Sequence, residues 1–250
     1  MASKIEWTEA TWNPTTGCTK ISAGCKHCYA ESMARRLKAI GTVGYENGFR
    51  FNTVPSRLYE PLKKKKPTVY FVNSMSDIFH EKMPLDYLDK IFSVIEQTPW
   101  HTYQLLTKRA DNMYDYLSKR EIPKNVWLGV TVENKFDGIP RIELLRNLKA
   151  TVLFLSVEPL LEDLGKLDLT NIDWVIVGGE SGTQARPMDK SWVENIKTQC
   201  DANDVAFFFK QWGTWGADKV KRNKKVNGKE LNGKIWQNYP EAIEKKFELV

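Results

Sequence analysis

The strongest constraint on the fold of this chain is an alternation, over residues 69–211, between short apolar runs and stretches of helical periodicity. Runs rich in β-branched and aromatic residues that alternate with helical stretches indicate βα units on a parallel sheet. Most of these runs are almost continuously apolar, which is typical of strands covered on both faces. They predict strands at residues 69–73, 103–107, 126–132, 152–157, 174–178 and 206–210.

Two of the intervening stretches have clear helical patterns. Residues 84–97 place five apolar side chains at helical spacing, namely Leu85, Leu88, Ile91, Phe92 and Ile95. Residues 191–202 repeat the pattern with Trp192, Val193, Ile196 and Cys200. Because such spacing puts the side chains on one helix face, we expect both faces to lie in the core.

The number of expected elements fixes the fold class. A further strand at residues 10–13 would bring the total to about seven, enough for a complete or nearly complete barrel. We therefore predict an α/β fold, a partial or near-complete (βα) TIM-like barrel over residues 1–212. Residues 213–250 are rich in Lys, Asn, Gly and Trp without a clear βα unit, and we expect a basic C-terminal extension packed on or over the barrel.

The charge balance is basic, with 37 Lys and Arg against 31 Asp and Glu and a net charge of +6. Such an excess suits a polyanionic partner. Much of it lies in two runs, residues 63–66 and 219–225, for which a solvated face is the alternative. No apolar stretch is long enough to cross a membrane, and the first residues do not resemble a signal peptide, so we expect no membrane partner and a cytoplasmic location.

Three of the four cysteines, Cys18, Cys25 and Cys28, form a C-x6-C-x2-C motif after the first expected strand. Thiolates suit iron-sulfur clusters, and a cubane held by three protein ligands leaves one iron open to an outside ligand. The motif therefore predicts a [4Fe-4S] cluster. Gly17 and Gly24, each next to a cysteine, would let the loop wrap closely around it.

Two alternatives to a cluster stay open. Zinc could bind the three cysteines with His27 or Cys200 as a fourth ligand, because structural zinc needs four. His27 lies between two of the other ligands, where simultaneous coordination is awkward, and Cys200 falls on an expected core face. Inert or redox-active thiols are the second alternative.

Several segments make the sequence similar to the radical SAM superfamily and, within it, to a phage-associated family marked by three cysteines followed by Tyr-Ala. These segments are WTEATWNPTTGC, GCKHCYAE, FVNSMSDIFH, LLTKR, WLGVTVEN, FLSVEPLL, VIVGGESG and FFFKQWG, and they span residues 5–213. The resemblance implies an incomplete βα barrel with the cluster loop after the first strand. The motif is three residues longer than the superfamily's commonest C-x3-C-x2-C spacing.

The resemblance also implies where S-adenosylmethionine would bind, since in that superfamily its amine, carboxylate and ribose are held at the carboxyl ends of the strands, as in other barrels. The amine candidates are Ser74, Ser76 and Asp77, the carboxylate candidates Lys108 and Arg109, and the ribose candidates Thr131, Glu133 and Asn134. Further polar or glycine positions at strand ends are Ser156, Glu158, Gly178, Gly179, Glu180, Ser181, Lys210 and Gln211. Turn formation or capping is the alternative for each, but together they predict a polar barrel mouth.

Two aromatic features have both a functional and a structural interpretation. His80, near an expected helix start, could act as a base or could serve as a capping or packing group. Trp212 and Trp215 could stack on nucleic-acid bases or pack as a lid or in the core. No catalytic residue is assigned from the sequence.

The resemblance implies an enzyme that uses a [4Fe-4S] cluster to cleave S-adenosylmethionine to a 5'-deoxyadenosyl radical, with an external electron donor. The basic charge, the Lys-rich extension, the tryptophans and the phage-associated resemblance favour a nucleic acid, nucleotide or modified base as substrate, for modification or lesion repair. One alternative is a radical SAM enzyme for a small molecule or peptide. Another is a zinc-stabilised nucleic-acid-binding module without catalysis. A partner protein could complete the open side of the barrel.

Overall fold

The computed structural model describes residues 5–241, which divide into two compact units. The first comprises the chain up to Ile21, Cys28–Gly129 and Leu148–Thr151, and the second comprises Ser22–His27, Val130–Asn147 and the chain from Val152 onward. Seven strands form one sheet in the order β1-β4-β5-β6-β7-β8-β9. Its edge strands are β1 and β9, so the sheet is open, and β6 (Val126–Thr131) contributes residues to both units.

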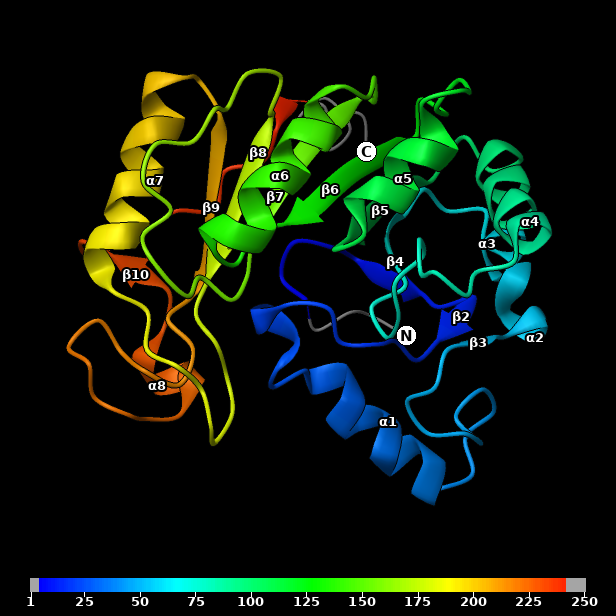
Figure 1. The fold of residues 1–250 in the computed structure, drawn as a ribbon, viewed down its shortest axis with the longest axis horizontal. Coiled ribbons are helices and arrows are strands. Elements are labelled where there is room, and N and C mark those ends of the chain that lie inside the picture. The colour runs from blue at the N-terminus through cyan, green and yellow to red at the C-terminus, as the bar shows by residue number, and fades with distance from the viewer. Residues whose placement is uncertain (1–4, 242–250) are drawn as a thin grey trace. The chain divides into compact units, whose positions relative to one another are not determined.

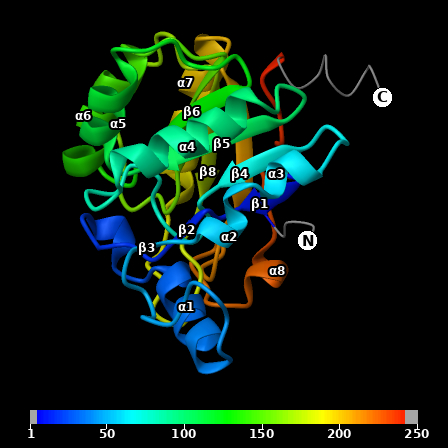
Figure 2. The ribbon, with the colours of Figure 1, turned by 90° about the vertical axis from the view of Figure 1, so that its right-hand side faces the viewer.

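The first unit is built on three parallel strands, β1 (Ala10–Trp12), β4 (Val69–Val72) and β5 (Thr102–Thr107). In register, Ala10 pairs with Tyr70, so β1 and β4 lie side by side (Figure 2). All four residues of β4 are buried. This explains the continuous apolar pattern, because a parallel strand with both faces covered has no solvent face to mark with polar residues.

Helices and a small hairpin complete the first unit. The helices are α1 (Tyr29–Ala39), α2 (Pro55–Leu58), α3 (Glu60–Lys63), α4 (Leu85–Glu96) and α5 (Ala110–Leu117), and the hairpin pairs β2 (Thr15–Thr16) with β3 (Asn52–Thr53). Helix α4 buries Leu88, Ile91, Phe92 and Ile95 as expected. The expectation for Leu85 is wrong: it is 68% exposed, because it is the first helical residue and lies outside the covered turns.

The second unit repeats the βα pattern with β7 (Val152–Val157), β8 (Trp174–Gly178) and β9 (Ala206–Gln211), which pair in parallel. Its helices are α6 (Lys135–Arg146) and α7 (Lys190–Ala202), and α7 runs beside β9 (Figure 1). Helix α7 buries Val193, Ile196 and Cys200 as expected, whereas Trp192, which we expected on the same buried face, is only half-buried.

The end of the described chain belongs to the second unit. It contains α8 (Lys224–Asn227) and a hairpin of β10 (Glu230–Leu231) and β11 (Lys234–Ile235). Beyond the hairpin, the chain runs antiparallel to β9, with Gln237 opposite Phe208, and covers the outer edge of that strand. Covering an edge removes a template for unwanted strand pairing. The predicted domain boundary after residue 212 stays a prediction, and residues 242–250 of the expected extension lie outside the described residues.

The predicted fold class is confirmed. Every expected strand is present, and the bounds of each differ from the prediction by at most one residue. The sheet is parallel wherever its pairing is given, and helices alternate with the strands, as in a partial βα barrel. In the described part of the chain, no helix has the length and apolar character needed to cross a membrane.

Candidate functional site

Cys18 follows β2 and comes directly after Gly17, a position at which the backbone tolerates only glycine. Gly17 has a φ of +75°, and a Cβ on it would lie 2.0 Å from the carbonyl oxygen of Arg50. The N–H of Gly17 donates to the Met75 carbonyl and that of Cys18 to the Phe49 carbonyl, both over 3.0 Å. Because the positive φ and the close approach both exclude a side chain, Gly17 fixes the start of the cysteine loop.

Cys25 and Cys28 lie at the ends of helical segments. Cys25 ends the 3-10 helix η1 (Ala23–Cys25), and its N–H donates to the Ser22 carbonyl over 3.0 Å. The Cys25 sulfur lies 3.6 Å from Oγ of Ser22. Cys28 is the N-cap residue of α1, in an extended conformation. All three cysteines of the motif are half-buried.

The cysteine loop is divided between the units, with Cys18 and Cys28 in the first and Cys25 in the second. Within residues 5–241, no three His, Cys, Asp or Glu side chains already form a metal-binding group. The chemistry of the donor set fits a [4Fe-4S] cluster, because the motif supplies three half-buried thiols and zinc would need a fourth ligand. The three metal ligands stay a prediction.

Arg109, which follows β5, is the main anchor of the Cys18 end of the loop. The residue is only 7% exposed. Its Nη2 donates to the carbonyl and hydroxyl oxygens of Thr19, over 3.1 and 2.7 Å, and its Nη1 donates to the Cys18 sulfur over 3.4 Å. Nη1 also donates to Asp77 over 3.2 Å, and Nε to Glu81 over 2.7 Å. A guanidinium has five N–H donors, so protein partners occupy all of them.

Asp77 holds this guanidinium and the turn that carries it. Its carboxylate accepts hydrogen bonds from the N–H of Phe79 over 3.0 Å, the hydroxyl of Thr107 over 2.7 Å and the N–H of Lys108 over 3.1 Å, in addition to the bond from Arg109. Burial works to lower the pKa of Arg109, but the charges of Asp77 and the other partners outweigh it and raise that pKa. These contacts give Asp77 a positioning role for Arg109.

His80 is buried and uses both ring nitrogens within the protein. Nδ1 accepts from the N–H of Lys82 over 3.1 Å, and Nε2 lies 3.2 Å from the Thr19 hydroxyl. The ring stacks on Phe51 with centroids 4.3 Å apart. Burial is the largest cause that lowers the pKa of His80, so the neutral imidazole is favoured. These contacts support the packing interpretation of this residue.

Glu133, fully buried after β6, anchors the other part of the loop within the second unit. Its Oε2 accepts from Nη1 of Arg141 over 2.6 Å, and its Oε1 accepts from the hydroxyl of Ser22. Arg141 also donates to the Thr131 carbonyl over 2.8 Å. A Cβ on Gly24 would lie 2.9 Å from the same Oε1, so the backbone of the loop passes close over the carboxylate.

Glu180 and Arg186 form a second anchor in this unit. Arg186 donates to the two carboxylate oxygens of Glu180 from Nε over 2.8 Å and Nη2 over 2.6 Å, and from Nη1 to the Ala23 carbonyl over 3.0 Å. Burial raises the pKa of Glu180, but the hydrogen bonds and charge of Arg186 outweigh it and hold that pKa below its usual 4.5. Ala23 begins the 3-10 helix that ends at Cys25, so the pair fixes this part of the loop.

The glycine pair at the end of β8 serves close packing inside the protein. A Cβ on Gly178 would lie 2.5 Å from Oε1 of Glu158, and one on Gly179 would lie 1.9 Å from the carbonyl oxygen of Trp212. Glu158 forms an ion pair with Lys210 over 2.9 Å. Protein groups therefore lie where the side chain of any residue other than glycine would be.

The serines after β4 lie in a hydrogen-bonded turn of the first unit. The Ser74 carbonyl accepts from the hydroxyl of Tyr29, and its hydroxyl donates to the side chain of Asn13 over 3.2 Å. The Ser76 hydroxyl lies 2.6 Å from that of Thr15. These bonds connect the turn to the N-terminal strands and to the start of α1.

Other predicted residues of the second unit have structural partners. Asn134 caps α6, accepting from the N–H of Asp137 over 2.7 Å. Ser156 is buried within the sheet. The hydroxyl of Ser181 accepts from Nε2 of Gln211 over 3.1 Å, which connects the ends of β8 and β9.

Cys200 and the two tryptophans have packing roles. Burial raises the pKa of Cys200 to about 12, and a thiol held protonated in the core is a poor metal ligand. The indole N–H of Trp212 donates to the Glu230 carbonyl over 2.8 Å, and that of Trp215 to the Ala185 carbonyl over 2.6 Å. Trp212 is buried, which agrees with the core-packing interpretation.

Several anchoring residues were not identified from the sequence. Arg186 and Arg141 were not identified because neither directly follows a strand. Arg186 lies in an irregular loop and Arg141 in a helix of weak amphipathicity. Glu81 and Ser22 are two further residues of this kind. An available signal was the carboxylate at the end of four expected strands, since a carboxylate that becomes buried there needs a cationic or hydrogen-bonding partner; these are Asp77, Glu133, Glu158 and Glu180.

Comparison with known proteins gives a family and a set of similar structures. No curated protein matches the chain. Among solved structures it is similar to spore photoproduct lyase complexed with dinucleoside spore photoproduct, at 12% identity and a TM-score of 0.43, covering 80% of this chain and 62% of that one. A variant of the lyase with bound AdoMet and the same ligand has 13% identity, a TM-score of 0.43 and the same two coverages.

Another variant of the lyase has 14% identity and a TM-score of 0.46, covering 99% of this chain and 73% of that one. The chain spans 62% of the length of the first of these structures. A family model described as a protein of unknown function, DUF5131, matches residues 2–240. This chain therefore belongs to the DUF5131 family.

Proposed function

We propose that this chain is a radical SAM enzyme that holds a [4Fe-4S] cluster through Cys18, Cys25 and Cys28. The observation that carries the proposal is the buried Arg109, whose Nη1 donates to the Cys18 sulfur. An arginine placed beside a cysteine complements the negative charge that the sulfur carries when it binds iron. A loop with three thiols that is held in this way is better explained by cluster binding than by an inert role for the cysteines.

When bound, the cluster supplies one electron, which breaks a carbon–sulfur bond of S-adenosylmethionine and gives methionine and a 5'-deoxyadenosyl radical. The residues of this chain position the ligands for that chemistry. Arg109 orients Cys18, while Glu133 and Arg186 hold the segment that carries Cys25. Each anchor is buried or half-buried, which limits motion of the loop.

Contacts to S-adenosylmethionine are proposed for polar side chains and for a glycine pair at the strand ends or just after them. They are Ser74, Ser76 and Lys108 in the first unit and Thr131, Asn134, Ser156, Glu158, Gly178 and Gly179 in the second. Asp77, Arg109, Glu133 and Glu180 are instead proposed to act through the cysteine loop, because they bind it directly or through an arginine. For the final substrate, the basic charge favours a nucleic acid or nucleotide.

Anaerobic reconstitution tests the proposal. The protein would be purified without oxygen and loaded with iron and sulfide, and deoxyadenosine would be measured by chromatography after addition of dithionite and S-adenosylmethionine. We expect about four irons per chain and deoxyadenosine formation in the natural protein. The Cys25→Ala variant should lose both.

Cys200→Ala is the matched control, because it removes a cysteine that is buried in α7 and distant in sequence from the motif. It should keep the iron content and the cleavage. Bound zinc in place of iron, or equal losses in the Cys25 and Cys200 variants, would refute the proposed cluster site.

A further inference from the structure

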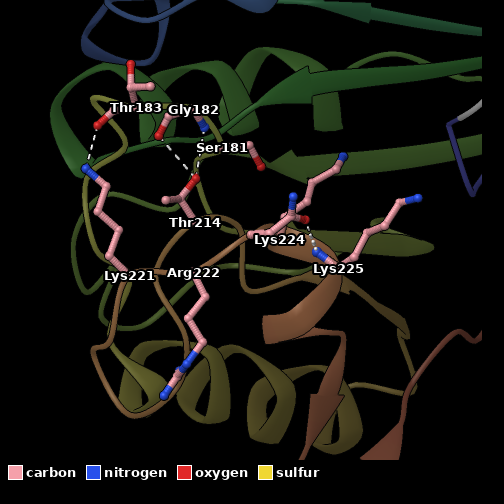
Figure 3. A pocket seen from close by; sticks show the side chains of 9 residues that line it. Ser181, Gly182, Thr183, Thr214, Lys221, Arg222, Lys224 and Lys225 are labelled. Carbon is pink, nitrogen blue, oxygen red and sulfur yellow. Dashed lines mark hydrogen bonds between the residues drawn. The ribbon is translucent and has the colours of Figure 1, made fainter.

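A basic pocket lies in the second unit, between the loop after β8 and the chain that leads into α8 (Figure 3). Its volume is about 530 Å³. One wall is formed by Ser181, Gly182 and Thr183, and Thr214 binds this wall through its hydroxyl, which accepts from the Gly182 N–H over 2.9 Å. The pocket therefore has a hydroxyl-lined wall fixed by backbone contacts.

Four cations also line the pocket, namely Lys221, Arg222, Lys224 and Lys225. No carboxylate is among the residues that line the pocket. Lys221 is held by a bond from its ammonium to the Thr183 carbonyl, and Arg222 is paired with Asp218 over 2.6 Å. The two remaining lysines are exposed, so their charges are available to an anion from solution.

The cations do not converge on one point. Figure 3 shows Lys221 reaching toward Thr183, Arg222 extending in another direction, and Lys224 and Lys225 extending to a third side. A single free phosphate would meet only part of this set. A chain with phosphates at regular spacing could contact several of the cations, as a positively charged groove does along a nucleic-acid backbone.

The pocket is connected to the cysteine loop within the same unit. Ser181 directly follows Glu180, whose partner Arg186 donates to the carbonyl of Ala23. Ala23 lies two residues before Cys25. A ligand that contacts Ser181 would therefore contact the sequence neighbour of Glu180, which together with Arg186 anchors the segment that carries Cys25.

We infer that this pocket binds the phosphodiester backbone of a nucleic-acid strand, as the substrate-binding surface of the proposed enzyme. The inference rests on the proposed function for its place in catalysis, but strand binding can be measured without any chemistry. The hydroxyls and backbone of the wall at residues 181–183 would position the strand. Lys224 and Lys225 would supply positive charge to the phosphates without distinguishing one base sequence from another.

Fluorescence anisotropy of labelled single-stranded DNA and RNA, each of about 20 nucleotides, tests the inference on the full chain. The Kd would be measured between about 50 and about 200 mM salt. In the Lys224→Ser/Lys225→Ser variant we expect weaker binding and a slope of log K against log salt that is shallower by about 1.4, because each single-strand phosphate contact contributes about 0.7.

Lys63→Ser/Lys66→Ser is the matched control, since it removes the same charge from two exposed lysines of the other basic run. It should leave the Kd and the slope nearly unchanged. An equal loss in both variants would mean that net charge alone attracts the strand, and it would overturn the inference. Unchanged binding in the Lys224→Ser/Lys225→Ser variant would overturn it as well.

Competition separates a strand from a small phosphate ligand. Inorganic phosphate and a nucleoside monophosphate should displace the labelled strand no better than chloride at equal ionic strength. Specific displacement by either would assign the pocket to a free phosphate and refute the strand. The Cys25→Ala variant should bind the strand with unchanged Kd, so loss of radical chemistry and loss of strand binding are distinguishable.

Discussion

Arg109 donates a hydrogen bond from Nη1 to the sulfur of Cys18 over 3.4 Å, and the same nitrogen donates to Asp77 over 3.2 Å. A buried carboxylate thus holds the cation that contacts a proposed metal ligand. The arrangement resembles the outer-shell contacts that orient ligands in metal sites, where the second partner matters nearly as much as the ligand.

Replacing Arg109 by Ala should destabilise the fold and impair cluster loading. The change would leave Asp77 buried without its cation, and breaking a buried ion pair from one side costs about 3–5 kcal/mol. Urea unfolding measures the loss of stability, and iron analysis after reconstitution measures the loading. Arg35→Ala, at an exposed arginine of α1 paired with Glu31, should change the free energy of unfolding by about 0.5 kcal/mol or less.

Arg109→Lys separates charge from geometry. Lysine keeps the positive charge but has three donors on one nitrogen in place of the five-donor fork. We expect a smaller loss of stability than in Arg109→Ala, with iron content still well below that of the natural protein. Full iron content in Arg109→Lys would contradict the view that the fork positions Cys18.

Arg186→Lys should loosen the part of the loop that carries Cys25. Lysine cannot donate at once to both oxygens of Glu180 and to the Ala23 carbonyl in the geometry that Arg186 uses. Hydrogen exchange of the amides in residues 22–27 should become faster, and iron content should fall. The control is Arg222→Lys, which alters a similar two-oxygen contact with Asp218 and should affect neither measurement.

Glu180 should make folding stability depend on pH in the acid range. Burial raises the pKa of this carboxyl, but hydrogen bonds from Arg186 outweigh it, so the folded pKa lies below the usual 4.5. A group whose pKa is lowered by folding adds stability above its unfolded pKa and loses that contribution as pH falls through the folded pKa. Glu180→Gln should therefore be less stable than the natural protein at pH 7, with a difference that shrinks below pH 4.5.

Urea unfolding of both proteins across this range checks the prediction. Subtracting the two curves removes the contribution of the other carboxyl groups. A difference in the free energy of unfolding that stays constant between neutral and acid pH would show that the ion pair with Arg186 does not set the pKa of Glu180.

The strands were predictable because a strand that is covered on both faces appears in the sequence as one short apolar run. Residues 152–157 and 174–178 were predicted with the bounds that the structure has. The site was less predictable. The sequence showed that Asp77 and Glu180 stand at strand ends, but the loop conformation decides that their partners are Arg109 and Arg186. Strand-end position therefore identified the carboxylates, and only the structure identified what they bind.

Gly179→Ala should be the most disruptive of the small substitutions at the strand ends. Its Cβ would lie 1.9 Å from the carbonyl oxygen of Trp212, a backbone atom that cannot rotate away. We expect a loss of roughly 3 kcal/mol in the free energy of unfolding, the upper part of the range for overpacking. Gly41→Ala is the control, because it has a positive φ of +67° but open space around the added carbon, and it should lose about 1 kcal/mol. If both variants unfold at the same urea concentration, contact with Trp212 is not the reason that glycine is required at this position.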